Sequence, residues 1–324
     1  MLGFGISVVA LWYALRGVEA RAVAVVLSSA RPGPVVAAVI ATIAVQLVRA
    51  ERWRGLFRPG ARPGRRDAFW IVSFAYLVST LLPLRAGDPA RAWLAQRRSG
   101  AGLAEAMATV VAERVLDLGA ILALMAIATP APMAALMAER FGAGPWSSPA
   151  ALRATIALAL AAAYGAAVVV AAHGARTRRW LGPSAVGRAV ATFVDGFAPL
   201  ASPRVALTAG LWSIVLWLLG ALSYWLVMRA VGIEEPVSVA IITLGVTAVF
   251  AVVPSSPGYV GVFEAAVRVA LGGMTDLDQS LIASYAVLLH GMTLVTLVVL
   301  GLFGAWALGL GVRSALVPPK SPTN

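Results

Sequence analysis

Nine apolar runs dominate this chain and constrain its fold more than any other feature. They cover residues 2–15, 33–48, 68–84, 103–128, 151–172, 205–228, 237–253, 258–272 and 280–310. A helix needs about 20 mainly apolar residues to cross a bilayer, and several runs reach that length. The chain is only 12% charged, whereas soluble proteins average about 25%. We therefore expect an all-α polytopic membrane protein, with a single domain over 1–312 and a short tail over 313–324.

The cationic residues lie in the loops between the apolar runs. The net charge is +12, and Lys320 is the only lysine among 26 cations. The basic loops are 49–67, 85–100 and 173–204, whereas 129–150, 229–236 and 272–279 are neutral or acidic. The positive-inside rule places the basic loops and both termini in the cytoplasm, with the chain in the inner (plasma) membrane. The rule explains the arginines without nucleic-acid binding, but the loop 16–32 carries three arginines and falls on the outer side.

The composition also bears on cofactors. The chain has no cysteine, and its two histidines, His173 and His290, are distant in sequence. Disulfides and thiolate metal sites are therefore excluded, and two distant histidines do not form the usual pattern of a metal site. We predict no cofactor.

Two apolar segments are interrupted and predict broken or re-entrant helices. The run 68–84 has basic loops at both ends and is at the lower length limit for a span. The segment 237–272 is split by prolines and glycines, and both of its ends fall on the outer, acidic side. One such segment from each side, one in each half, is the sequence sign of an inverted repeat. The two segments share a P-x-x-x-G pattern, at 83–87 and 254–258, although chance or two independent interfacial turns would also give it. The chain then has about six to eight transmembrane helices.

Three charged residues, Glu113, Arg114 and Asp117, interrupt the fourth apolar run. A charge at the centre of a membrane helix costs about 2.5–3.5 kcal/mol on insertion scales, so it persists where it pairs or lines a wet cavity. Glu113 and Asp117 are four residues apart and share a helix face, with Arg114 three residues from Asp117. One interpretation is an internal ion pair that fixes helix packing, with Arg85 or Arg91 as a partner. The other is a polar binding or proton-relay site inside the bundle.

The turn at 83–91 offers a site for an anion. Gly87 allows a tight backbone, and Asp88 followed by proline predicts an N-cap with proline at the first helical position. A helix N-terminus carries free N–H groups and a positive partial charge, which suit a phosphate. Arg85 and Arg91 would add bidentate contacts. The alternative is a surface turn whose arginines contact bulk lipid headgroups.

The break in the second half predicts an unwound segment followed by a new helix. Ser255 or Ser256 would cap this helix and Pro257 would begin it. Gly258 and Gly261 would allow a close approach of the backbone.

Two further polar residues lie near this break in the predicted fold. Glu264 either pairs with Arg268, four residues later, or faces the same cavity as Glu113. His290 lies within the last long run, where we expect a hydrogen-bonded interior histidine rather than a proton carrier.

Three blocks of the sequence follow the patterns of a known family. Residues 83–91 are similar to P-x-R-x-G-E-x-x-R, residues 113–117 to E-R-x-x-D, and residues 254–264 to P-x-x-P-G-x-x-G-x-x-E. With the pair Arg52-Trp53, they resemble the flippase-like family, also described as the transmembrane part of lysylphosphatidylglycerol synthase. The resemblance covers nearly the whole chain. It departs from the family pattern at Asp88, where glutamate is usual, and at 79–80, where an asparagine is common.

The resemblance implies translocation of a lipid with an anionic or modified headgroup: a phospholipid, an aminoacyl-phospholipid or a lipid-linked sugar. Its implied headgroup-binding and cleft residues are Arg85, Gly87, Asp88, Arg91, Glu113, Arg114, Asp117, Pro257, Gly258, Gly261 and Glu264. The partners would be membrane lipids and enzymes of envelope-lipid synthesis. We expect no soluble aminoacyltransferase domain after the last run, so synthase activity is not implied.

Two rival interpretations stay open. An integral-membrane lipid transferase would use Glu113 or Asp117 as a general base, although the sequence has no metal-binding carboxylate cluster and no nucleophile–base pair. A non-transporting accessory protein of envelope-lipid synthesis would bind its partners even with these charges neutralised. If the translocation hypothesis is right, Arg114→Ala or Asp117→Asn abolishes headgroup movement in liposomes and leaves the protein folded.

Overall fold

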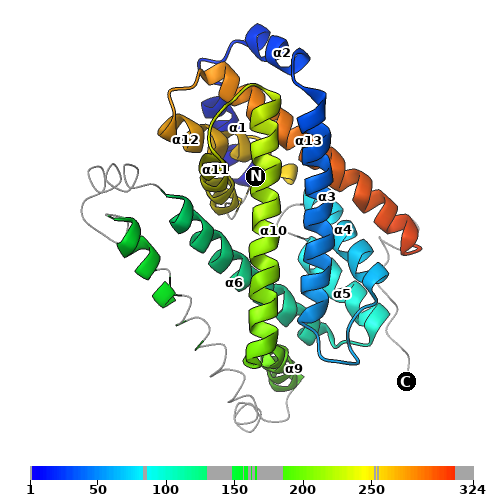
Figure 1. Cartoon of the computed structure of the whole chain (residues 1–324). Helices are drawn as coiled ribbons and strands as arrows, with labels where there is room; N and C mark the ends of the chain where they lie inside the picture. The colour runs from blue at the N-terminus through cyan, green and yellow to red at the C-terminus, as the bar shows by residue number, and fades with distance from the viewer. Residues whose placement is uncertain are drawn as a thin grey trace.

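Helices make up all the regular structure in the described part of the chain (Figure 1). The computed structural model describes residues 2–82, 86–129, 148–155, 157–159, 162, 165, 185–251, 253 and 255–310. The elements are α1 (Leu2–Leu15), α2 (Ala20–Ser28), α3 (Pro32–Gly55), α4 (Arg65–Leu81), α5 (Gly87–Ser99), α6 (Leu103–Ala128), α9 (Ala185–Asp195), the 3₁₀ turn η1 (Ala198–Ala201), α10 (Pro203–Ala230), α11 (Val237–Phe250), the 3₁₀ turn η2 (Pro257–Tyr259), α12 (Val262–Met274) and α13 (Gln279–Ala307). The predicted all-α class is confirmed. The apolar runs coincide with these helices, except for 151–172, which lies mostly outside the described residues.

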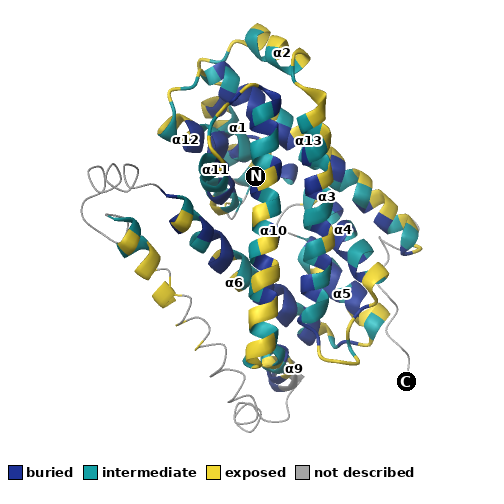
Figure 2. Ribbon diagram, in the orientation of Figure 1, coloured by how far each residue is buried: buried dark blue, intermediate teal, exposed yellow. Residues whose placement is uncertain are grey.

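Three of the described helices, α3, α10 and α13, are long and apolar enough to cross a membrane. α6 is also long, with 26 residues, but its apolar sequence is interrupted by Glu113, Arg114 and Asp117. The outward surface of α10 is largely exposed (Figure 2), and its exposed residues include Leu207, Leu211 and Leu218. An extended apolar outer surface of this kind suits contact with lipid and supports a membrane protein.

α3 and α10 run in opposite directions and form the centre of the bundle (Figure 1). Thr42 Oγ1 and Ser223 Oγ are 3.1 Å apart, and ten residues further along α3 Arg52 Nη1 donates to Ser213 Oγ at 2.8 Å. α3 continues to Gly55. Placing the start of the basic loop at residue 49 was therefore wrong, because the last turns of this helix are packed against α6 and α10.

α4 and α5 fold back on each other as a helical hairpin. At the tip the Gly87 N–H donates to Ser79 Oγ at 3.2 Å, and at the open end Arg98 lies 3.8 Å from Asp67. A Cβ on Gly87 would lie 1.9 Å from the Ala75 carbonyl oxygen, so glycine is required for this approach. The start of α4 and the end of α5 lie together at one end of the bundle, as expected from the basic loops that flank the third apolar run. Re-entry into a membrane stays a prediction.

α11 and α12 form a second pair of contacting helices, joined by the break that contains η2. Gly258 has φ 70° and Gly261 has φ 87°, both in the left-handed region that favours glycine. η2 packs against α4, with Gly258 beside the Thr80 carbonyl. Since Thr80 is near the tip of the first hairpin, the two breaks meet at the C-terminal end of α4. An inverted repeat stays a prediction that this arrangement supports.

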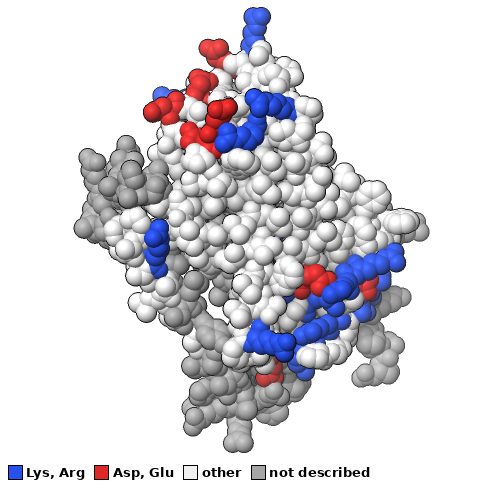
Figure 3. Space-filling model, in the orientation of Figure 1, with Lys and Arg blue, Asp and Glu red and all other residues white. Residues whose placement is uncertain are grey.

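Charged side chains gather at two opposite ends of the molecule, and the band between them is nearly uncharged on the face shown in Figure 3. At the basic end, Arg65 Nε lies 3.3 Å from Glu51, and the Arg98 side chain donates to the Leu308 carbonyl. These contacts bring the ends of α3 and α13 together with the open end of the α4–α5 hairpin.

The opposite end carries the acidic loops. The Arg31 N–H donates to the Ala230 carbonyl at 2.9 Å, and the Glu19 N–H donates to Ser280 Oγ at 3.3 Å. The segment around α2 therefore lies at the acidic end despite its arginines, as the predicted loop scheme requires. Which end faces the cytoplasm stays a prediction.

Candidate functional site

The Glu113 carboxylate is at the centre of the candidate site and bridges two arginines from different helices. Its Oε1 accepts from Arg52 Nη2 at 3.1 Å, and its Oε2 lies 2.6 Å from Arg91 Nη1. The exposed fractions of the side chains are 2% for Glu113, 0% for Arg52 and 4% for Arg91. Buried charges are stable only when they are paired and hydrogen-bonded. This bridge therefore ties α3, α5 and α6 together.

Asp117, one turn further along α6, shares one of these arginines. Its Oδ1 accepts from Arg52 Nη1 at 2.6 Å and from Trp217 Nε1 at 3.2 Å. The neighbouring Arg114 makes no hydrogen bond to it within the described structure. Asp117 is held by α3 and α10, whereas the predicted partner Arg91 contacts Glu113.

Arg114 points instead toward α5. Its Nη2 donates to both oxygens of Asp88, at 2.8 and 3.0 Å, and Arg91 Nη2 lies 3.8 Å from the same carboxylate. α5 begins at Gly87, and no side chain caps its N-terminus. The prediction of Asp88 as the N-cap is therefore wrong, because its carboxylate binds Arg114. The first two motif blocks do meet in space, through Arg91 with Glu113 and through Asp88 with Arg114.

An aromatic residue supports this part of the site from behind. The Arg91 guanidinium lies over the Trp53 ring, 5.0 Å from its centroid. Trp53 is fully buried and donates through Nε1 to Thr109 Oγ1 at 3.0 Å. The Arg52-Trp53 pair thus contributes one residue to each side of the carboxylate bridge. Arg85, predicted to join this site, lies outside the described residues.

Arg49 is the residue that the sequence interpretation missed. It lies one turn before Arg52 on α3, and its guanidinium stacks over the Tyr76 ring at 4.6 Å. The Asp117 charge is near enough to act on it through space, but no hydrogen bond or ion pair joins Arg49 to another group in the described structure. Its Nε is buried without a partner. The i, i+3 spacing with Arg52 was the signal that could have placed it on the same face.

We call these residues the arginine cluster: Arg49, Arg52, Arg91, Arg114, Asp88, Glu113 and Asp117. Its four guanidinium groups face three carboxylates, which leaves one positive charge without a counter-charge among the described residues. An unpaired charge in a poorly hydrated site costs several kcal/mol. The cluster can therefore bind an anion, with Arg49 as the free cation.

A second ion pair at the edge of the cluster fixes the start of α6. Arg58 Nε and Nη2 donate to the two Glu105 oxygens at 2.9 and 2.7 Å. This bidentate hydrogen bond raises the pKa of the Arg58 guanidinium. The Arg58 side chain is 62% exposed and that of Glu105 is 3% exposed, so a surface arginine covers a buried carboxylate at the basic end.

The second constellation lies at the α11–α12 break. Glu264 Oε1 is 2.6 Å from His290 Nδ1, and Glu264 Oε2 accepts from the Gly261 N–H at 2.7 Å. The predicted pair with Arg268 is wrong: Arg268 donates to backbone carbonyls at the end of α1, including that of Ala14 at 3.1 Å. Within the described structure, Glu264 makes no contact with the arginine cluster.

The local geometry of the break also differs from the expectation. Pro257 begins the single turn η2, and no side chain caps it. α12 starts later, at Val262, with Gly261 as its N-cap and the Glu264 carboxylate bonded to the Gly261 N–H. The predicted serine cap at 255 or 256 is therefore wrong, because a carboxylate three residues into the helix satisfies that N–H. Ser256 instead donates its own N–H to Ser7 Oγ at 2.8 Å.

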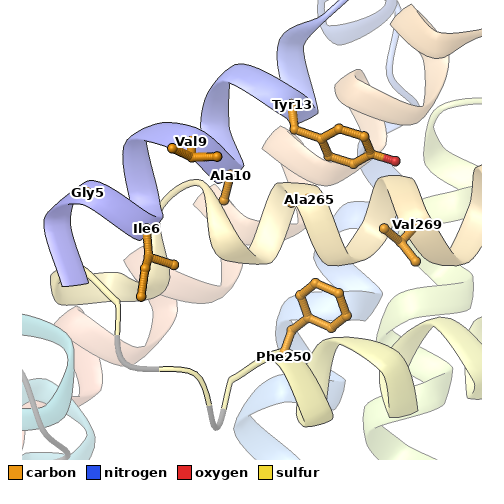
Figure 4. A pocket seen from close by; sticks show the side chains of 8 residues that line it. All are labelled: Gly5, Ile6, Val9, Ala10, Tyr13, Phe250, Ala265 and Val269. Atoms are coloured by element: carbon orange, nitrogen blue, oxygen red, sulfur yellow. The ribbon is translucent and has the colours of Figure 1, made fainter. Parts of the chain in front are cut away.

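An apolar groove of about 610 Å³ lies between α1, α11 and α12 (Figure 4). Its lining residues are Gly5, Ile6, Val9, Ala10, Tyr13, Phe250, Ala265 and Val269. None of them is charged, so the groove suits hydrocarbon and not a headgroup.

Comparisons with known proteins agree with the motif blocks. The family model described as the lysylphosphatidylglycerol synthase TM region matches residues 1–301. A curated relative, named Glycosyltransferase AglD, from Haloferax volcanii, is 24% identical over 347 aligned residues that cover 97% of this chain. The chain spans 55% of the length of that relative. No solved structure matches the chain.

Proposed function

The chain belongs to the lysylphosphatidylglycerol synthase TM region family, and on this premise we propose that it moves a lipid with an anionic headgroup across the membrane. The observation that carries the proposal is the free guanidinium of Arg49. It is stacked on Tyr76, its Nε has no hydrogen-bond partner, and no ion pair joins it to another group within the described structure. A lipid phosphate supplies the missing negative charge, and a guanidinium suits phosphate geometry.

The arginine cluster would receive the headgroup, while the acyl or prenyl chains remain in the bilayer. Arg114 is the most accessible pairing arginine, with a side chain 40% exposed. Its partner Asp88 also lies 3.8 Å from Arg91, so Arg114 can turn toward a phosphate while Asp88 keeps a neighbouring counter-charge. Arg85 and Gly87 would line the entrance at the hairpin tip. Glu113 and Asp117 would keep the arginines in place.

The second break would form the other half of the path. Pro257, Gly258, Gly261 and Glu264 lie at this break, and η2 packs on α4 near the tip of the first hairpin. We propose that the two hairpins are re-entrant segments of an inverted repeat in the inner membrane, with the basic end and the C-terminus in the cytoplasm. Discontinuous helices that meet near the midplane are the usual place for a transported substrate.

A membrane-bound transferase is the alternative that the relative's name favours. The contacts of the carboxylates weigh against it. Both Glu113 oxygens already accept from arginines, and Asp117 Oδ1 accepts from Arg52 and Trp217. A general base must be free to take a proton from the substrate. Glu113 does not meet that condition, and Asp117 is already held by two donors.

The test is transport of fluorescent phosphatidylglycerol in proteoliposomes, measured as the fraction of label protected from an external quencher. Arg49→Gln should slow the protein-dependent movement about tenfold or more, since a hydrogen bond to a charged group contributes about 1.5–3 kcal/mol. Arg97→Gln is the matched control, because Arg97 stacks over Trp93 at the same 4.6 Å but is exposed on α5.

Other outcomes would replace the proposal. Equal rates for Arg49→Gln, Asp117→Asn and the unmodified protein would contradict it. A labelled lipid of changed mass would favour the transferase. Intact binding of envelope-lipid enzymes without any lipid movement would favour an accessory role.

A further inference from the structure

His290 makes two hydrogen bonds that together require an additional proton. Its Nε2 lies 2.8 Å from the Gly258 carbonyl oxygen, which can only accept. Its Nδ1 lies 2.6 Å from Glu264 Oε1. A neutral imidazole carries one N–H, so it can donate to only one of these two oxygens.

We infer that His290 and Glu264 form a proton-binding site at the α11–α12 break. With Nε2–H donated to Gly258, the short contact between Nδ1 and Oε1 needs a second proton, carried either by the imidazolium or by a protonated Glu264. The other carboxylate oxygen is already an acceptor, because the Gly261 N–H donates to it at 2.7 Å. The pair therefore holds one proton more than a neutral imidazole beside a carboxylate.

No other charged group contacts the pair within the described structure. Among the charged residues of the described structure, the hydrogen-bonding partner of Glu264 is His290. Arg268, on the same helix, donates to backbone carbonyls of α1. The other titratable residues on the surrounding elements are Tyr13 on α1; Arg65, Arg66, Asp67 and Tyr76 on α4; Arg204, Tyr224 and Arg229 on α10; Tyr259 in η2; and Tyr285 on α13, while α11 has none. Tyr224 bonds to Thr247 and Tyr285 to the Tyr224 carbonyl, so neither supplies the proton.

Loss of the proton to water would break one of the two hydrogen bonds of His290. If the remaining N–H stays with the carboxylate, two lone pairs face each other between Nε2 and the Gly258 carbonyl. η2 then loses its hydrogen bond to α13. If the N–H stays with Gly258, the same repulsion arises at Glu264, and α12 loses its hydrogen bond to α13. Either way, the protonated pair closes the break and the deprotonated pair loosens it.

α4 connects this break to the arginine cluster. η2 packs against α4 beside Thr80, and Thr80 Oγ1 donates to the carbonyl of Tyr76, on whose ring Arg49 stacks. We infer that proton binding at His290 and anion binding at Arg49 bias the position of the same helix. This coupling rests on the proposed function, whereas the proton-binding site does not.

The first test measures the protonation state of His290. The chain has two histidines, so His173→Gln leaves His290 as the only imidazole for nitrogen-15 NMR of the full chain in nanodiscs. The site predicts Nε2 protonated below the step, and one proton lost from the His290–Glu264 pair in a single step as the pH rises. In Glu264→Gln the side-chain amide donates to Nδ1, so the imidazole should stay neutral with the same Nε2–H tautomer and show no such step. An imidazole that titrates alike in both proteins, or an Nδ1–H tautomer at every pH, would overturn the inference.

The second test measures hydrogen exchange at the α11–α12 break. Backbone amides of 255–261 should exchange with deuterium at least tenfold faster above the proton-loss step, after correction for the intrinsic effect of pH. Glu264→Gln should show no such change. Equal exchange on both sides of the step would exclude the loosening.

Failure of the proposed function gives a different pattern. It would leave the NMR step and the exchange change intact while phosphatidylglycerol transport is absent. If the coupling holds, an imposed pH gradient should accelerate transport in the unmodified protein and not in Glu264→Gln.

Discussion

Replacing the central carboxylate, Glu113→Gln, should destabilise the bundle far more than the same change at an exposed carboxylate. Glutamine keeps the shape but removes the negative charge, and its amide nitrogen must face an arginine donor. The Arg91 guanidinium would keep only the Trp53 ring at 5.0 Å and Asp88 at 3.8 Å. Arg52 would keep Asp117 and Ser213.

The magnitude follows from burial. Removing one partner of a buried ion pair costs about 3–5 kcal/mol, because the other charge stays buried without compensation. Glu113 is 2% exposed and bridges two arginines. Glu51 also contacts two arginines, Arg54 at 2.9 Å and Arg65 at 3.3 Å, but it is 34% exposed. Exposed pairs contribute about 0–1 kcal/mol, so Glu51→Gln should cost no more than that.

The assay is reversible unfolding of the purified protein in mixed micelles, with the free energy of unfolding compared among the three proteins. The loss of unfolding free energy at Glu113→Gln should be at least three times that at Glu51→Gln. Equal losses of unfolding free energy would refute the conclusion that this buried bridge stabilises the packing of α3, α5 and α6. Adding Arg91→Met to Glu113→Gln should recover part of the lost stability, because the second change removes the cation that has no partner. A double-mutant cycle measures this coupling.

Two further changes probe the packing around the cluster. Gly301→Ala should lower the free energy of unfolding by about 1–3 kcal/mol, because the added Cβ would lie 2.3 Å from Leu77 Cβ and force α13 away from α4. Gly291→Ala is the control in the same unfolding assay, because a Cβ at that position of the same helix meets open space. Trp217→Phe should cost about 1 kcal/mol through loss of one hydrogen bond to Asp117, and an unchanged free energy of unfolding would contradict that bond.

The helical framework was largely predictable, because a membrane helix is specified by local apolar content. The runs 33–48, 103–128 and 280–310 each lie within or nearly coincide with a helix, α3, α6 and α13 respectively. The two interruptions were also visible, since proline and glycine mark them directly. These signals need no knowledge of what packs against what.

The partners of the charged residues were not predictable by helix spacing. The predicted partner Arg91 does contact Glu113, but Arg268 does not pair with Glu264: the structure pairs Asp117 with Arg52 and Glu264 with His290. Each true partner comes from another helix, 65 and 26 residues away. Such pairings depend on which helix faces are in contact, and i, i+3 or i, i+4 spacing carries no information about that.

Arg49 shows the same limit at a loop boundary. A count of charges placed it in the basic loop, although α3 continues to Gly55. The aromatic ring beneath it, Tyr76, belongs to α4. Only the packing of these two helices reveals a cation without a counter-charge.

The most direct test of the anion site is the selectivity of transport for net headgroup charge. Phosphatidylglycerol and phosphatidylethanolamine both carry a phosphate, but only the first has a net negative charge that neutralises the arginine cluster. The ratio of their transport rates should favour phosphatidylglycerol in the unmodified protein and in Arg97→Gln. It should fall toward one in Arg49→Gln. A ratio that Arg49→Gln leaves unchanged would contradict the assignment of Arg49 as the receptor for an anionic lipid.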